Sequence, residues 1–179
     1  METLRRLTSG DAARYARLRL RMLHDSPWAF GSSPEDDFAL DREHLVQMFA
    51  SEAEAATVAF EDPETGELIA AAGVRRESKK KFRHRATIWG VYVEPAHRGK
   101  GLGAELIATL LEIARGWPGV DYVDLGVSEG APEAKRLYER FGFRAWGREP
   151  GATQLEDGRR FDEIHMTLLL HAPSDGSAV

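Results

Sequence analysis

Cysteine is absent from all 179 positions of the chain. Disulfide bonds and thiolate metal ligands are therefore excluded, and so is covalent catalysis through a cysteine nucleophile. Any stability must come from a packed core, and a chain of this length can build a substantial one.

Long hydrophobic segments are also missing. No apolar run approaches the roughly 20 residues that a membrane-spanning helix needs. The first six residues, METLRR, lack the apolar stretch of a secretory signal. Hydrophobic residues make up 42% of the chain and charged residues 30%, which is typical of soluble globular proteins. We therefore expect a cytoplasmic protein without a membrane partner.

The chain has neither an excess of basic charge nor a metal-binding spacing. Its formal net charge of −5 argues against a nucleic-acid partner. The six histidines show no ligand spacing such as His-Glu-x-x-His, so we expect no metal. One short basic segment, residues 79–85, carries five lysines and arginines. It is either a solvated hairpin tip or a patch that steers an anionic cofactor or an acidic substrate.

What the chain does have is a glycine-rich segment, residues 91–104, with the sequence VYVEPAHRGKGLGA. It leads from a β-branched strand into an amphipathic helix. The first N–H groups of a helix lack internal partners and lie at the positive end of the helix dipole. Gly99, Gly101 and Gly103 would let the backbone approach an anion, and Arg98 could add a charge-assisted contact. The segment therefore predicts a site for a phosphorylated ligand.

Two other interpretations of this segment remain open. Gly99-x-Gly101-x-x-Ala104 also satisfies a dinucleotide-binding fingerprint, with Asp121 or Asp124 near the distance of a ribose-binding acid. Its glycines come five residues after the strand ends, however, and the chain has one strand-helix-strand unit of this kind. The simplest alternative is a glycine-rich turn that only begins a helix. A Walker A loop is excluded, because no Gly-Lys-Ser/Thr occurs.

The hydrophobic periodicity and the turn residues predict a fold of the α/β (α+β) class. The predicted strands cover residues 3–8, 57–61, 68–76, 86–93, 122–127, 143–149 and 159–170. The first predicted helix ends at about residue 24. The other three cover residues 41–51, 101–115 and 132–141. The three strands between residues 57 and 93 are expected to form an antiparallel meander. The helix at 101–115 is a crossover connection, which makes strand 122–127 parallel to strand 86–93. We expect a single mixed, mostly antiparallel sheet with helices on both faces, in one domain over residues 1–171 with a frayed tail at 172–179.

Two motifs carry a resemblance to a known family. Arg98-x-x-Gly101-x-Gly103 resembles the acetyl-coenzyme A signature of the GNAT superfamily of N-acetyltransferases. Ala134-x-x-Leu137-Tyr138-x-x-x-Gly142-Phe143 is similar to the second conserved block of that superfamily. The order of the elements fits as well, so the resemblance covers nearly the whole chain. One departure is Ala131, where the family often has an asparagine.

The resemblance implies a GNAT fold with acetyl-CoA as cosubstrate. The strand at 86–93 would splay from the strand at 122–127, and the pantetheine arm would enter the gap and pair with the backbone like an added strand. The expected cofactor-binding residues are Val91, Tyr92, Val93, Arg98, Gly99, Lys100, Gly101, Leu102, Gly103 and Ala104. The last six would hold the pyrophosphate on their N–H groups.

Tyr138 is the expected catalytic residue, because the resemblance implies a position near the cofactor sulfur, where it could protonate the departing thiolate. A core tyrosine is the alternative, since Ala134, Leu137 and Phe141 share its helical face. Trp28, Phe30 and Trp89 either line the substrate pocket or pack in the core.

The general base stays open among a water chain and five side chains: Glu77, His84, Glu94, Asp124 and Glu129. Asp162 and Glu163, on the last strand, either attract an amine to the acceptor pocket or keep an edge strand soluble.

The resemblance implies an enzyme that transfers acetyl directly from acetyl-CoA to a primary amine. We expect a small-molecule amine or amino acid as substrate, because an acidic protein suits a cationic partner. Two alternatives remain: a non-catalytic sensor that binds acyl-CoA, and an acetyltransferase for protein N-termini or lysines. A homodimer through a sheet edge is a further option.

Overall fold

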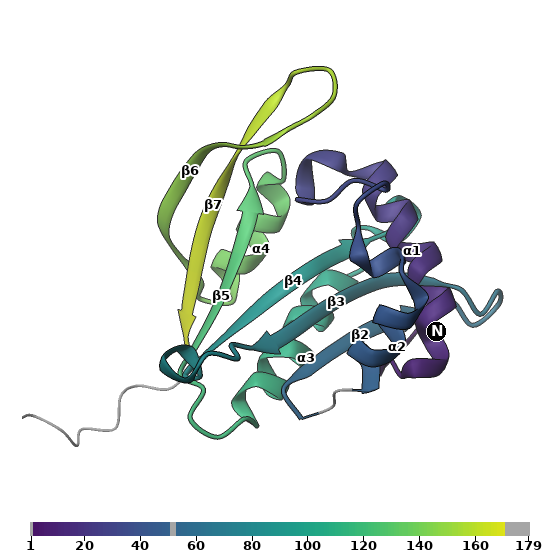
Figure 1. Ribbon diagram of the computed structural model, residues 1–179, viewed down its shortest axis with the longest axis horizontal. Helices are drawn as coiled ribbons and strands as arrows, with labels where there is room; N and C mark the ends of the chain where they lie inside the picture. Colours follow the sequence, from purple (N-terminus) through teal and green to yellow (C-terminus); the bar gives the residue numbers. More distant parts are fainter. Residues whose placement is uncertain (1, 51–52, 171–179) are drawn as a thin grey trace, which may run out of the picture.

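The computed structural model describes residues 2–50 and 53–170, which form one mixed sheet covered by helices (Figure 1). The strand order is β1-β2-β3-β4-β5-β7-β6. The strands are β1 (Thr3–Arg6), β2 (Ala55–Glu61), β3 (Leu68–Arg76), β4 (Arg85–Val93), β5 (Tyr122–Ser128), β6 (Arg144–Gln154) and β7 (Arg160–Leu169). The α-helices are α1 (Ala12–Asp25), α2 (Arg42–Ala50), α3 (Leu102–Arg115) and α4 (Pro132–Arg140). Short 3-10 helices are η1 (Ser9–Asp11), η2 (Pro27–Ala29), η3 (Phe38–Leu40), η4 (Lys80–Phe82) and η5 (Pro95–His97).

The predicted elements are confirmed in kind and order, including the antiparallel meander β2-β3-β4 and the parallel pairing of β4 with β5. Several boundaries differ by one or two residues, and the largest error is at the end of β6. β6 continues to Gln154, five residues beyond the predicted end, through Pro150 and Gly151. Its register against β7 shifts between Glu149 and Thr153, and such an irregularity on an edge strand accommodates a proline without a ladder hydrogen bond. The expected tail at 172–179 lies outside the described residues.

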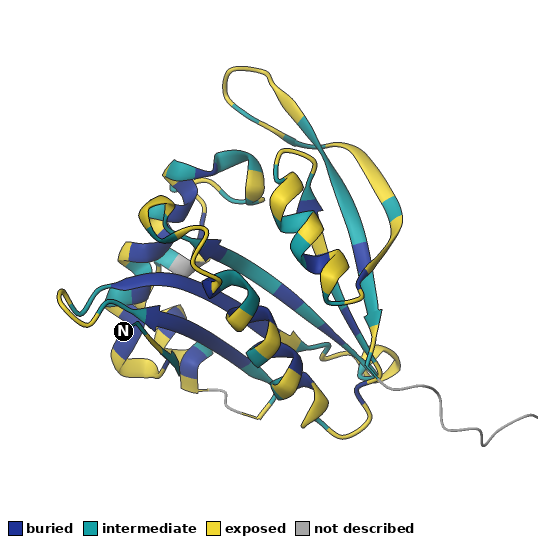
Figure 2. Ribbon diagram, turned by 180° about the vertical axis from the view of Figure 1, so that it is seen from behind, coloured by how far each residue is buried: buried dark blue, intermediate teal, exposed yellow. Residues whose placement is uncertain are grey.

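The sheet separates two apolar layers. Along β2, Val58 and Phe60 face the layer beneath α3, whereas Ala59 faces the layer beneath α1 and α2, as the two-residue period of a strand requires. Helix α1 turns one face inward, where Tyr15, Leu18 and Met22, spaced three and four residues apart, are all buried. Figure 2 shows β2 and β3 as the most continuously buried strands. No helix in the described part of the chain is long and apolar enough to cross a membrane.

β4 and β5 pair at one end and then part. Their register covers only Arg85–Thr87 against Tyr122–Asp124, and the arrows diverge beyond it (Figure 1). Arg85 holds the closed end with two hydrogen bonds to Asp124, of 2.5 and 2.6 Å. Gly90 has φ 63°, and the register of β4 against β3 shifts beside it, so β4 bends away from β5. The splayed pair that the resemblance implies is therefore present.

Candidate active site

A cleft of about 750 Å³ opens where β4 and β5 part. We call it the long cleft. One wall is β4 from Ile88 to Val93, and the opposite wall is β5 from Leu125 to Ser128 together with the first turns of α4. The loop before α3 closes one end, and residues of η2 border the other side. The cleft therefore connects the N-terminus of a long helix with an open strand edge.

The loop that leads into α3 presents backbone donors to the long cleft. Gly99 and Gly101 have φ of 79° and 89°, and a Cβ at either would meet no atom within 4 Å. Glycine is required here by backbone conformation, not by space. In the described residues, no hydrogen-bond acceptor is found for the N–H groups of residues 99–103, whereas those of Ala104 and Glu105 donate to the Gly101 carbonyl. Unpaired donors at the positive end of a 14-residue helix are suited to hold an anion, and binding of a phosphate here stays a prediction.

Two basic side chains of this loop are engaged elsewhere. The Arg98 Nε donates to the Val93 carbonyl at 2.9 Å, and its guanidinium forms an ion pair with Asp25 and lies over the Tyr92 ring. Arg98 thus ties the end of β4 to the end of α1, and a direct contact between Arg98 and a phosphate stays a prediction. Lys100 contacts Glu2 at 3.3 Å and does not line the cleft. The anion site is therefore built mainly from backbone groups.

The backbone N–H and C=O groups of Val91 and Val93 form the edge of β4 that faces the gap. Glu94 N–H donates to Ile69 on the β3 side, so the groups of alternate residues point toward β5. Arg98 already occupies the Val93 carbonyl, which leaves both backbone groups of Val91 facing the gap. The Tyr92 ring packs on the other face of the sheet, where burial and the nearby Asp25 carboxylate raise its pKa to about 12.

Tyr138 combines a core ring with a cleft hydroxyl. The residue is 5% exposed, and its ring packs against Phe143 with centroids 6.0 Å apart. It also lines the long cleft, and no described residue forms a hydrogen bond with its hydroxyl. Burial raises the pKa of Tyr138 above its ordinary value, so the hydroxyl keeps its proton. Tyr138 is therefore both a core residue and a lining residue of the long cleft, and its catalytic role stays a prediction.

A smaller pocket of about 320 Å³ meets the long cleft at the gap. We call it the junction pocket. The two share residues 28–30, residues 88–90 of β4, Gly126 and Ser128. The junction pocket extends to the face of the sheet that carries α1 and η3, where Arg19 and Phe38 line it. Trp28, Phe30 and Trp89 therefore line pockets, with Phe30 and Trp89 also packed against the core layer beneath α1 and α2.

Glu163 brings a carboxylate without a partner into the junction pocket. A Cβ at Gly126 would lie 1.6 Å from its Oε1, so the carboxylate occupies the space that a side chain on β5 would fill. No described residue forms a hydrogen bond or an ion pair with it. Its neighbour Asp162 is different, because it pairs with Arg148 and accepts the Gly151 N–H at 2.7 Å.

Each of the five side chains considered as a base has a partner. Asp124 pairs with Arg85, Glu94 with Arg21, and Glu129 with Arg148, while Glu77 accepts the Thr87 hydroxyl and His84 packs edge-on against Tyr122. The sequence indicated Asp162 and Glu163 as acids that could attract an amine but not which of the two is free, and Glu163 is the one without a partner among the described residues. The one available signal was Gly126 in the middle of a strand, where a glycine often marks a close approach.

The comparisons with known proteins identify the family. Residues 19–143 match the model of the acetyltransferase (GNAT) family. The chain belongs to the GNAT family. A mycothiol acetyltransferase from Brachybacterium faecium is 36% identical over 73% of this chain, which spans only 39% of that protein. The N-alpha-acetyltransferase RimI from Mycobacterium tuberculosis is 29% identical over 81% of this chain and 80% of its own length.

Solved GNAT structures share the fold. An acetyltransferase of the GNAT family from Streptococcus pneumoniae has a TM-score of 0.83 at 21% identity, covering 94% of this chain and 99% of its own. A GNAT phosphinothricin acetyltransferase from Sinorhizobium meliloti, solved in complex with acetyl-CoA, has a TM-score of 0.79 at 18% identity, covering 98% and 94%. At these identities the likeness concerns the fold, and it confirms the expected GNAT architecture.

Proposed function

We propose that this protein transfers an acetyl group from acetyl-CoA directly to a primary amine of a small molecule, with residues 1–171 as one catalytic domain. The observation that carries the proposal is the meeting of two pockets at the gap between β4 and β5. One holds unpaired backbone donors at its far end, and the other holds an unpaired carboxylate. Two reactants held on either side of such a gap gain most of their advantage from proximity.

The residues of the long cleft suit acetyl-CoA. The N–H groups of residues 99–103 and the dipole of α3 would hold the diphosphate, and the open geometry at Gly99 and Gly101 leaves room for its oxygens. Val91, with both backbone groups facing the gap, would pair with the pantetheine amides as an added strand does. Support also comes from the Sinorhizobium meliloti protein, which has this fold and was solved with acetyl-CoA.

Tyr138 would act as the proton donor. When bound, acetyl-CoA supplies an activated acyl thioester whose sulfur departs as a thiolate. Tyr138 lines the long cleft, and its hydroxyl keeps its proton and has no competing partner in the described residues. A positioned donor of this kind contributes roughly 10²–10⁴-fold to a rate.

Glu163 would hold the acceptor amine and receive its proton. An ammonium group cannot attack a carbonyl, so the amine must become neutral at the gap. An unpaired carboxylate over Gly126 attracts the cation electrostatically and then accepts its proton, directly or through one water. Trp28 lines both pockets, and its ring lies so close to Gly130 that a Cβ there would be 2.6 Å from it.

The proposed activity is tested by thiol release from acetyl-CoA across a panel of small amines, amino acids and a short peptide with a free N-terminus, with thermal stability measured in parallel. We expect CoA to raise the melting temperature and at least one amine to support release. Stabilisation by CoA with no release for any amine would make the protein an acyl-CoA sensor. Release with a peptide N-terminus alone would make it a protein acetyltransferase.

Gly126→Ala should lower kcat/KM about 100-fold, because the new Cβ would displace the Glu163 carboxylate, and a misplacement of about 1 Å can cost that much. Stability should change little, since the displaced atoms are the end of a flexible side chain. Kinetics and thermal unfolding of the variant give the two values. Glu163→Gln is the matched comparison and should show a similar loss without a steric change. Full activity in both variants would remove Glu163 from the site.

A further inference from the structure

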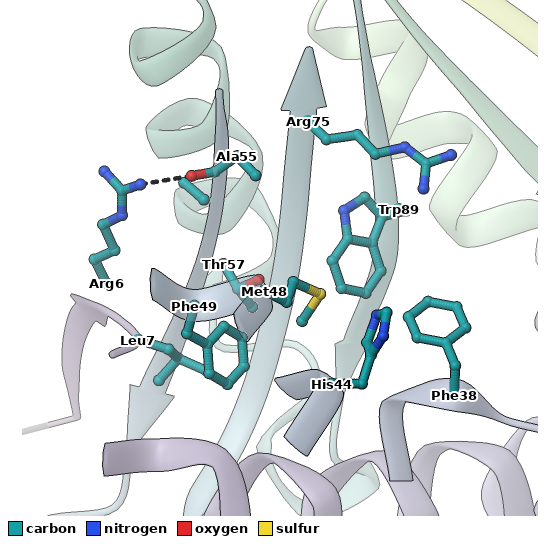
Figure 3. Close-up of a pocket in the computed structure, with 11 residues that line it drawn as sticks. Arg6, Leu7, Phe38, His44, Met48, Phe49, Ala55, Thr57, Arg75 and Trp89 are labelled. Atoms are coloured by element: carbon teal, nitrogen blue, oxygen red, sulfur yellow. Dashed lines mark hydrogen bonds between the residues drawn. The ribbon is translucent and has the colours of Figure 1, made fainter. Parts of the chain in front are cut away.

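A third pocket, of about 350 Å³, lies beneath α2 and borders the junction pocket. We call it the apolar pocket. Six of its lining residues are Leu7, Phe38, His44, Met48, Phe49 and Trp89 (Figure 3). It shares Phe38, Arg75 and Trp89 with the junction pocket. The apolar pocket lies on the face of the sheet that carries α1 and α2, and a molecule bound at the gap would reach it past Trp89.

Trp89 lies at the boundary between the junction pocket and the apolar pocket. The missing side chain at Gly73 leaves room for its ring. A Cβ at Gly73 would lie 2.3 Å from the indole, so the ring can lie against β3 only because residue 73 has no side chain. In Figure 3 the indole lies between Arg75 and the His44–Phe38 pair, whose rings meet edge to face at 4.7 Å. The flat aromatic surface of Trp89 thus faces both the polar junction and the apolar pocket.

Arg75 supplies an uncompensated positive charge at this boundary. It is exposed, it lines both pockets, and among the described residues no acceptor pairs with its guanidinium. The neighbouring charges are neutralised: Arg19 pairs with Asp37 at 2.6 Å, and Asp162 pairs with Arg148. The junction pocket therefore presents one free cation and one free anion, Arg75 and Glu163.

We propose that the acceptor is a free amino acid with a large apolar side chain, an inference that rests on the proposed acetyl transfer. Its amine lies at Glu163, its carboxylate pairs with Arg75, and its side chain fills the apolar pocket. The charge pattern of a zwitterion matches that of the junction pocket, and a guanidinium binds a carboxylate with paired hydrogen bonds. The N-terminus of a peptide carries an amide in place of the carboxylate, so Arg75 favours the free amino acid.

The test compares kcat/KM for L-phenylalanine, phenethylamine and L-alanine by thiol release. Phenethylamine lacks the carboxylate, and L-alanine lacks the bulky side chain. We expect phenylalanine to be preferred over each by about tenfold or more, the usual effect of one charge-assisted hydrogen bond or of burying an apolar side chain. Arg75→Gln should reduce the preference over phenethylamine about tenfold through KM, while Lys79→Gln, on an exposed cation outside the pockets, should keep it.

A second variant tests the apolar pocket. Met48→Trp fills it from α2 and should reduce the preference for phenylalanine over alanine about tenfold. Val46→Trp adds the same ring on the exposed side of α2 and should keep the preference. If amines are acetylated but the wild type and all four variants show the same substrate ratios, this inference is wrong and the acetyl transfer stands. If CoA binds and no amine reacts, the proposed function itself is wrong.

Discussion

Gly101→Asp should weaken CoA binding at least 100-fold, about 2.7 kcal/mol. The added carboxylate would lie among the backbone donors that we assign to the diphosphate. Two like charges about 4 Å apart near a protein surface repel by roughly 4 kcal/mol. The positive φ at this position strains any side chain, but aspartate is among the residues that tolerate positive φ and its Cβ would meet no atom within 4 Å, so the variant should fold. Isothermal calorimetry with CoA measures the affinity, and thermal unfolding without ligand verifies the fold.

Gly101→Asn is the matched control for this experiment. Asparagine has the same shape as aspartate, and both tolerate the left-handed conformation that φ 89° requires. The asparagine variant should therefore lose much less affinity than the aspartate variant, and the difference measures charge alone. Equal affinities of both variants and the parent would mean that the N-terminus of α3 holds no anionic part of the cofactor.

Tyr138→Phe should lower kcat by roughly 10²–10⁴-fold and leave the affinity for CoA nearly unchanged. The substitution removes only a hydroxyl that has no partner among the described residues, and the packing of the ring against Phe143 is kept. Stability should consequently change by less than about 1 kcal/mol. Single-turnover rates and CoA calorimetry separate the two effects, and a parental kcat would leave Tyr138 as a core residue.

The pH profile gives a second readout for the same residue. Burial raises the pKa of Tyr138 above its ordinary value of about 10, so the proton donor stays protonated as the pH rises. The rate of the parent should therefore increase with pH as the amine loses its proton. It should show no decrease at any pH below 10. Tyr122→Phe, on the closed end of β5 and outside the three pockets, should leave both the rate and the profile as they are.

Much of the fold could be predicted because its signals are local. A two-residue period marks the strands and a 3.6-residue period marks the helices, so β3 was predicted at its observed bounds. The anion site was predicted for the same reason, since glycines at alternate positions before a helix determine where its N–H groups lie. The end of β6 was missed, because the shift at Glu149 depends on pairing with β7.

Which charged groups are free to act was decided only by the tertiary structure. The sequence offers many acids and arginines near the gap but does not say which of them neutralise each other. Partners such as Asp124 and Arg85, or Arg98 and Asp25, are 39 and 73 residues apart. Glu163 and Arg75 are candidates because they lack such partners among the described residues. Gly126 leaves space for the Glu163 carboxylate, and Gly73 leaves space for the neighbouring Trp89 ring. The sequence by itself therefore indicated the family and predicted an anion site, whereas only the long-range packing of the sheet shows which charged groups near the gap lack partners, because charge compensation and cavity shape are properties of the folded chain.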